Sequence, residues 1–172
     1  MFFVYAMAAL LSSSTVHAGK LAGGFRGKPF EEIPADQFQK PLDSCREGDR
    51  EGVIWTCDTT IAEQPVLVRY MHASGVYWGY ALVTTGSDLV GAYALCQKML
   101  AVYEAAYGTA DFLDKYRTGT LDRRYWVDGT TYATFEYKQT YGWCELMVFD
   151  TALYDLVKRR IQKDAAKGVD DL

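Results

Sequence analysis

The chain has 172 residues, of which 49% are hydrophobic, and a formal net charge of −4 at pH 7. This charge disfavours nucleic acid as a partner, because the phosphate backbone attracts cationic surfaces. Beyond the first residues, no segment has the roughly 20 consecutive apolar residues that a membrane span needs. Composition therefore favours an ordinary globular protein without a membrane span.

Residues 1–18 have the pattern of a cleavable signal peptide. An apolar run from Phe2 to Leu11 leads through a Ser/Thr stretch to Val16-His17-Ala18, a small-x-small cleavage site. We expect cleavage after Ala18 and a periplasmic or secreted mature protein. No Lys or Arg precedes the apolar run, so translation from an upstream start is an alternative.

Residues 19–51 form an acidic amino-terminal segment that we expect to pack on the domain that follows. Across residues 31–63 the sequence has nine acidic and three basic side chains. Such an excess can form an acidic face for a basic partner, but it is more typical of a solvated loop beside a hairpin.

From residue 52 onward the hydrophobic pattern predicts regular structure. Residues 52–58, 65–71 and 76–84 alternate with a period of two and are rich in β-branched and aromatic residues, as in antiparallel strands. A helical stripe follows over residues 87–107, capped by Ser87 and ended by Gly108. Its members are Leu89, Tyr93, Cys96, Leu100, Tyr103 and Tyr107.

The same order then returns in the second half of the chain. Residues 120–127, 130–138 and 142–149 alternate again, with Asp128-Gly129 as a hairpin signal. Asp150 or Thr151 caps a second helix, and residues 166–172 are expected to be a flexible tail. The pattern over residues 52–165 therefore predicts one α+β domain in a tandem βββα arrangement. We expect an antiparallel sheet of about six strands with both helices on one face.

Four cysteines predict two disulfides, because an even count in an exported chain favours pairing. Cys96 lies on the buried helical stripe, and Cys144 shares a strand face with the aliphatic residues that should meet the helices. We therefore predict Cys96–Cys144 and Cys45–Cys57, although the other two connectivities remain possible.

The sequence offers little for catalysis or for a cofactor. After residue 18 the only histidine is His72, in a predicted turn without a neighbouring nucleophile pattern. There is no C-x-x-C pair, no zinc-ligand spacing and no phosphate-binding loop. We assign no catalytic residue, no metal ligand and no cofactor.

The candidate binding site is the sheet face that points away from the helices. Aromatic residues, Met and Arg are enriched at protein interfaces, and this face should carry them if it is uncovered. The alternative is that residues 25–51 fold across it and make it core. The predicted site residues are Arg124, Trp126, Tyr132, Glu136, Trp143 and Met147, with Thr134 and Glu145 between them.

Several motifs carry a family resemblance. Phe25-Arg26-Gly27-Lys28-Pro29-Phe30, Trp126-Val127-Asp128-Gly129 and Cys144-Glu145-Leu146 resemble small exported bacterial proteins of unassigned function with an F-x-G-x-P-F opening. The resemblance implies a bacterial envelope protein and no particular activity. The tandem layout is also similar in architecture to secreted proteinaceous enzyme inhibitors that bind through an open sheet.

These observations lead to one functional hypothesis and two alternatives. The first is a non-catalytic binding protein whose acidic segment and aromatic face engage another protein, as an inhibitor or immunity factor against a basic enzyme. The second is a module that binds a small ligand or an envelope glycan by stacking on the same aromatics. A hydrolase of unknown type is the third.

Overall fold

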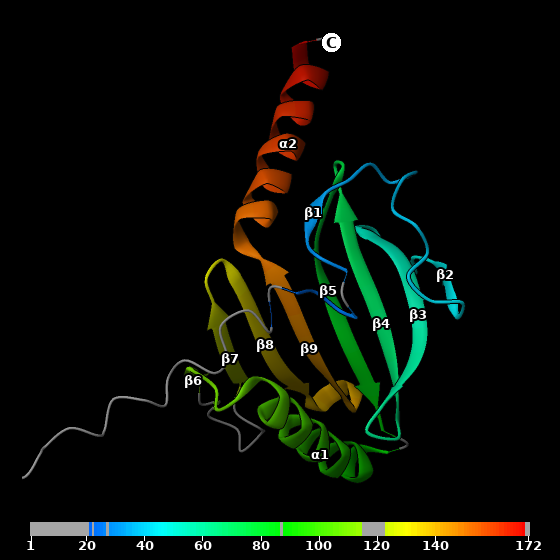
Figure 1. Cartoon of the computed structure of the whole chain (residues 1–172), viewed down its shortest axis with the longest axis vertical. Helices are drawn as coiled ribbons and strands as arrows, with labels where there is room; N and C mark the ends of the chain where they lie inside the picture. Colours follow the sequence, from blue (N-terminus) through cyan, green and yellow to red (C-terminus); the bar gives the residue numbers. More distant parts are fainter. Residues whose placement is uncertain (1–20, 22, 27, 87, 115–122, 171–172) are drawn as a thin grey trace, which may run out of the picture.

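The computed structural model describes residues 21, 23–26, 28–86, 88–114 and 123–170. It has two helices and a nine-stranded antiparallel sheet (Figure 1). The predicted α+β class and antiparallel sheet are confirmed, but the prediction of about six strands is wrong. The expected signal peptide, residues 1–18, lies outside the described residues.

The six expected strands are present, and three short ones join them. In chain order the strands are β1 (Glu31–Glu32), β2 (Cys45–Glu47), β3 (Val53–Ile61), β4 (Gln64–Ala73), β5 (Val76–Thr85), β6 (Phe112–Asp114), β7 (Arg123–Asp128), β8 (Thr131–Lys138) and β9 (Trp143–Asp150). The helices are α1 (Leu89–Tyr107) and α2 (Thr151–Asp170), with a 3₁₀ turn η1 (Gln139–Tyr141) before β9. Across the sheet the order is β2-β3-β4-β5-β9-β8-β7-β6.

The extra strands β1, β2 and β6 contain only two or three residues each, so they carry no alternating pattern that a sequence could reveal. β1 has a distinct place. The pairing of β5 with β9 ends at Gly79 and Phe149, and β1 then pairs with β5 from Tyr77 onward. A segment of the amino-terminal region therefore continues the sheet where β9 turns away into α2.

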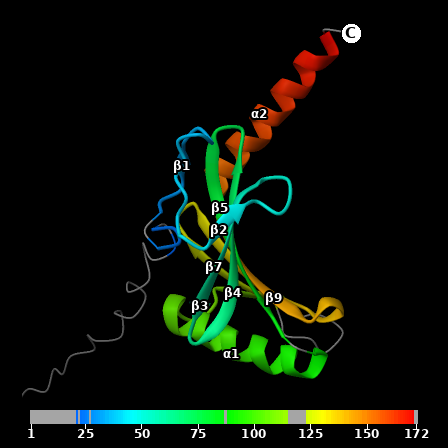
Figure 2. The same ribbon diagram turned by 90° about the vertical axis from the view of Figure 1, so that its right-hand side faces the viewer.

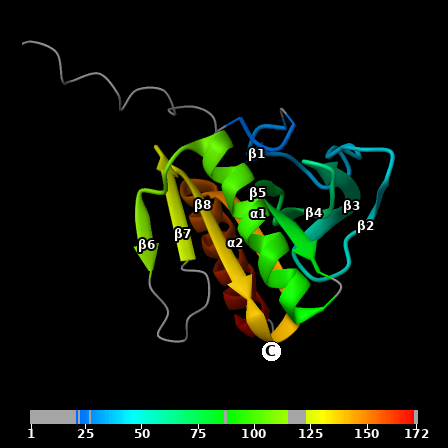
Figure 3. The same ribbon diagram turned by 90° about the horizontal axis from the view of Figure 1, so that it is seen from below.

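α1 packs on one face of the sheet and contacts β5, β8 and β9 (Figures 2 and 3). Its stripe is buried as predicted at Cys96, Leu100 and Tyr103. The helix begins one residue later than expected, because the Asp88 carboxylate accepts the Gly91 N–H at 2.7 Å. Ser87 lies outside the described residues, and Gly108 ends the helix with a φ of 92° as expected.

Both predicted disulfides are confirmed. Cys96–Cys144 joins α1 to β9, and Cys45–Cys57 joins the neighbouring strands β2 and β3. All four cysteines are buried, and the described part of the chain has no free cysteine.

The amino-terminal segment packs on the α1 side of the first sheet half. The Phe38 ring lies 4.8 Å from Tyr77 and 6.2 Å from Tyr70, and the Phe25 ring lies 5.3 Å from Tyr80. Tyr70, Tyr77 and Tyr80 are all buried. Most of this segment therefore forms core with β4 and β5, and only the loop between β2 and β3 reaches the opposite face, where Arg50 contacts Glu145 of β9.

α2 packs on the face opposite α1, so the prediction of both helices on one face is wrong. Its Tyr154 ring contacts Phe149 and Trp78, and Phe149 alternates with Val148 and so points away from the α1 side. Beyond these contacts α2 extends away from the sheet (Figure 1). It runs to Asp170, so the expected tail over residues 166–172 is helical up to that residue. Among the described residues, no helix is both long and apolar enough to cross a membrane.

Candidate functional site

We call the sheet surface opposite α1 the outer face. Strand alternation defines it clearly on β8 and β9, where each fully buried residue toward α1 is followed by a half-buried residue on the other side. Its members on these strands are Tyr132, Thr134, Glu136, Lys138, Trp143, Glu145, Met147 and Phe149.

Four of the six predicted site residues lie together on this face. Tyr132 stands opposite Phe149, and their rings stack at 6.2 Å with 24° between the planes. Thr134 stands opposite Met147, and Lys138 stands opposite Trp143. The predicted residues Tyr132, Glu136, Trp143 and Met147 are therefore neighbours on two central strands.

The placement of Arg124 and Trp126 on this face is wrong. β7 and β8 are joined by a two-residue turn, which pairs Trp126 with Ala133 and Arg124 with Phe135. Residues opposite each other share a face, so both side chains point toward α1. Trp126 is 2% exposed, and its indole N–H donates to the Gly108 carbonyl at 2.8 Å. Arg124 contacts the Glu104 carboxylate of α1 at 3.6 Å.

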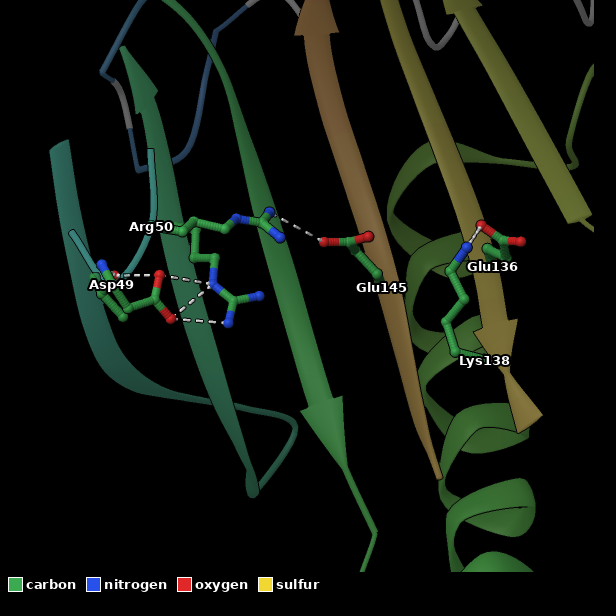
Figure 4. A network of polar contacts seen from close by, with 7 residues as sticks. Asp49, Arg50, Glu136, Lys138 and Glu145 are labelled. Atoms are coloured by element: carbon green, nitrogen blue, oxygen red, sulfur yellow. Dashed lines mark hydrogen bonds and ion pairs between the residues drawn. The ribbon is translucent and has the colours of Figure 1, made fainter. Parts of the chain in front are cut away.

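A line of charged side chains crosses the outer face (Figure 4). Glu136 accepts a hydrogen bond of 2.6 Å from Arg123 and another from Lys138. Burial alone would raise the pKa of Glu136, but these hydrogen bonds and charges hold it below its ordinary value. The carboxylate is therefore fixed in its charged form between two cations.

Glu145 stands directly opposite Glu136 and has a different environment. Its nearest cation is Arg50, at 4.0 Å, and only 15% of its side chain is exposed. Burial raises the pKa of the Glu145 carboxyl, and Arg50 and Arg69 offset this only in part. The outer face thus holds one firmly paired and one weakly paired carboxylate side by side.

The loop between β2 and β3 brings two further charged residues to this face. Asp49 forms a bidentate ion pair with Arg69 of β4, with distances of 2.9 to 3.2 Å. Hydrogen bonding from Arg69 lowers the pKa of Asp49. The next residue, Arg50, reaches across toward Glu145 on β9 (Figure 4). The loop is thereby tied to both halves of the sheet.

The charged line was only partly visible in the sequence. Arg69 interrupts an otherwise apolar strand pattern, which is a signal for an exposed or paired position. Asp49 and Arg50 lie inside the acidic stretch, where nothing distinguishes them from their neighbours. Their ion pairs with Arg69 and Glu145 join residues that are 20 or more positions apart, and such pairs leave no periodic pattern.

Two further features lie at the end of this face near the start of β9. A hollow of about 200 Å³ opens between β3, β4 and β5, and it is lined by Asp58, Thr59, Pro65, Val66, Leu67, Val83 and Thr85. Tyr141 stacks on Trp143 with 25° between the ring planes and 6.3 Å between centroids. Tyr141 is 70% exposed.

His72 lies in β4, not in the turn in which it was expected. It is 8% exposed, its Nε2 donates to the Ile33 carbonyl at 2.6 Å, and its ring packs on Phe38. These contacts fasten the amino-terminal segment to the sheet.

Within the described residues, no group of three or more His, Cys, Asp or Glu side chains could hold a metal ion.

No protein-family model matches this chain, and no curated protein and no solved structure matches it either.

Proposed function

We propose that the protein is a non-catalytic binding protein of the periplasm or the extracellular space that engages another protein through its outer face. The observation that carries the proposal is the half-buried row of Tyr132, Trp143 and Met147 on the two central strands β8 and β9. Tyr and Trp are typical of binding hot spots, and Met is enriched at interfaces. Central strands hold such side chains in fixed positions, which lowers the entropy lost on binding.

The charged line supports the same proposal. Glu136, Arg123 and Lys138 are already held in one arrangement by their mutual hydrogen bonds. Charges that are fixed before association select complementary partners and suppress others. The outer face therefore combines apolar contact area with a fixed charge pattern.

The acidic side chains of residues 31–63 would steer a basic partner toward the molecule. All nine acidic side chains of residues 31–63 are exposed. Three of them form ion pairs, Glu32 with Arg160, Asp49 with Arg69 and Asp58 with Arg46. The other six, Glu31, Asp36, Asp43, Glu47, Glu51 and Glu63, form no ion pair with a described residue. Unpaired exposed charges of one sign accelerate association with an oppositely charged surface.

An exported location fits the two disulfides, because such bonds form and persist in oxidising compartments. A disulfide-stapled domain with a rigid face is the architecture expected of an inhibitor or immunity factor that acts outside the cytoplasm.

The test is capture from an envelope extract with the oxidised mature protein as bait. Met147→Glu places a charge in the apolar row of the outer face, and Val90→Glu makes the matched change at an 83% exposed position of α1. We expect one protein to be retained by the wild type and by Val90→Glu and to be lost with Met147→Glu. Retention by all three baits, or by none, would contradict the proposal, provided that all three melt at similar temperatures.

A further inference from the structure

The hollow near the start of β9 lies where the sheet divides. β4 and β5 pair down to Leu67 and Val83, and no further pair joins them beyond that point. β4 continues beside β3, whereas β5 continues beside β9 through Thr85 and Trp143. Residues of the two strand edges that separate here line the hollow.

The lining of the hollow is apolar at its floor and polar at its rim. Leu67 and Val83 contribute the apolar part, and Asp58 and Thr85 contribute polar side chains. Arg46 does not line the hollow, but it donates to the Asp58 carboxylate at 2.7 Å, so a charged donor stands beside this charged acceptor. Both are more than half exposed and can turn toward a ligand. At about 200 Å³ the hollow is smaller than a drug-sized site and accepts a single ring.

An aromatic platform adjoins the hollow. Trp143 stands directly opposite Thr85, so its side chain emerges on the same side of the sheet beside the lining. The Tyr141 ring lies nearly parallel to that of Trp143, and it is one of the most exposed large side chains in the described part of the chain. The exposed Tyr141 ring and the half-buried Trp143 ring beside it offer aromatic surface to a ligand that has an apolar face.

We propose that the hollow and the Tyr141–Trp143 platform form a saccharide-binding site. A sugar ring with equatorial hydroxyls has a flat face of C–H groups, which stacks on aromatic rings, and a perimeter of hydroxyls. The perimeter hydroxyls can bond to Asp58, Arg46 and Thr85, since charged donors and acceptors form the strongest such bonds. The size of the hollow limits direct recognition to one ring of a longer chain.

This site shares Trp143 with the proposed protein-binding row, but Asp58 and Tyr141 lie outside that row. The row is tested at Met147, and Asp58→Asn tests the saccharide site alone. Loss of one activity with retention of the other is therefore measurable with these two variants, and failure of either proposal leaves the other standing.

The probes are two tetrasaccharides of β-1,4-linked, gluco-configured sugars, one of N-acetylglucosamine and one of glucose. Both present flat C–H faces, and they differ only in the acetamido group. We expect at least one to bind the oxidised mature protein and to change its tryptophan fluorescence, with calorimetry giving the dissociation constant. Trp143→Ala and Asp58→Asn should each weaken binding at least about tenfold.

Phe112→Ala is the control, because Phe112 is an aromatic residue of β6 with 62% exposure, outside the hollow and its platform. It should leave the dissociation constant unchanged. No binding of either tetrasaccharide at about 10 mM would overturn the proposal. Binding that survives Trp143→Ala and Asp58→Asn would also overturn it.

Discussion

Trp126 and Trp143 each lie in a strand whose sequence alternates between apolar and polar residues, but their environments in the fold differ. Trp126 is buried against α1 and its N–H is bonded to the Gly108 carbonyl. Trp143 lies on the outer face and is only half-buried. The first residue therefore belongs to the core and the second to the surface that we propose for binding.

We expect Trp126→Ala to lower the free energy of unfolding by about 3–5 kcal/mol, because it leaves a large cavity and an unpaired carbonyl. Trp143→Ala should cost less than about 1 kcal/mol, as is usual away from the core. Urea unfolding of the two variants measures both values. Equal losses would show that the face assignment of β7 is wrong.

Glu145 gives a pH-dependent prediction. Its pKa is raised in the folded protein, so its contribution to stability is fully present below the unfolded pKa of about 4.3 and is lost as the pH rises through the raised folded pKa. We expect Glu145→Gln to raise the melting temperature at pH 7 and to have little effect at about pH 3.

Asp49→Asn is the companion variant with the opposite sign. The hydrogen bond from Arg69 lowers the Asp49 pKa, so its stabilisation is present above the unfolded pKa and is lost as the pH falls through the lower folded value. This variant should lower the melting temperature at pH 7.

A lower melting temperature of Glu145→Gln at pH 7 would contradict the prediction for Glu145. It would mean that the ion pair with Arg50 stabilises the protein by more than burial of the carboxylate destabilises it.

At the scale of elements, the β3–β4 turn is strained. Its two central residues, Ala62 and Glu63, have φ values of 48° and 65°, a conformation that costs L-residues roughly 1–2 kcal/mol each. Asn-Gly is the preferred pair at such positions. We expect the double change Ala62→Asn, Glu63→Gly to raise the free energy of unfolding by about 1–2 kcal/mol.

The matched control for this turn is Gly129→Ala in the β7–β8 hairpin. Gly129 has a φ of 61°, and an added Cβ would meet nothing within 4 Å, so only backbone strain changes. We expect a loss of about 1 kcal/mol. Chemical denaturation of both variants gives the two changes in the free energy of unfolding. The turn variant should gain stability and Gly129→Ala should lose it; changes of the same sign would contradict the strain assigned to the β3–β4 turn.

The two disulfides connect different elements and should differ in how much each contributes to the free energy of unfolding. Cys96–Cys144 closes a loop of 48 residues and Cys45–Cys57 a loop of 12. The chain-entropy argument gives about 4 kcal/mol for the first and about 3 kcal/mol for the second. Double Cys→Ala variants, compared by urea unfolding, should show the larger loss for the pair that ties α1 to β9. The reverse order would mean that the edge strand β2 depends on its disulfide more than α1 does.

At the scale of the whole molecule, the long elements and both disulfides were predictable because each carries its own local signal. Alternation marked β3, β4, β5, β8 and β9, and a helical stripe marked α1. The face of β7 was misassigned although the predicted Asp128-Gly129 turn already settles it. That turn would pair Trp126 with Thr131, and the observed turn pairs it with Ala133; both partners lie on the face opposite Tyr132.

The side of the sheet on which α2 packs had no sequence signal. An amphipathic helix shows that it buries a stripe but not which surface covers it. The contacts of Tyr154 with Trp78 and Phe149 decide this, and they depend on where β9 leaves β5. The charged line was missed for a related reason, since Arg50 and Glu145 meet only across the assembled sheet.

We propose that the outer face of β8 and β9 contacts another protein. Oxidative footprinting of the mature protein, alone and in an envelope extract, tests it most directly. Met147 is half-buried on this face, and Val90 on α1 is 83% exposed. We predict that the extract protects Met147 and Tyr132 several-fold while the labelling of Val90 stays the same. Equal labelling of Met147 with and without the extract, or protection confined to α1, would contradict the claim.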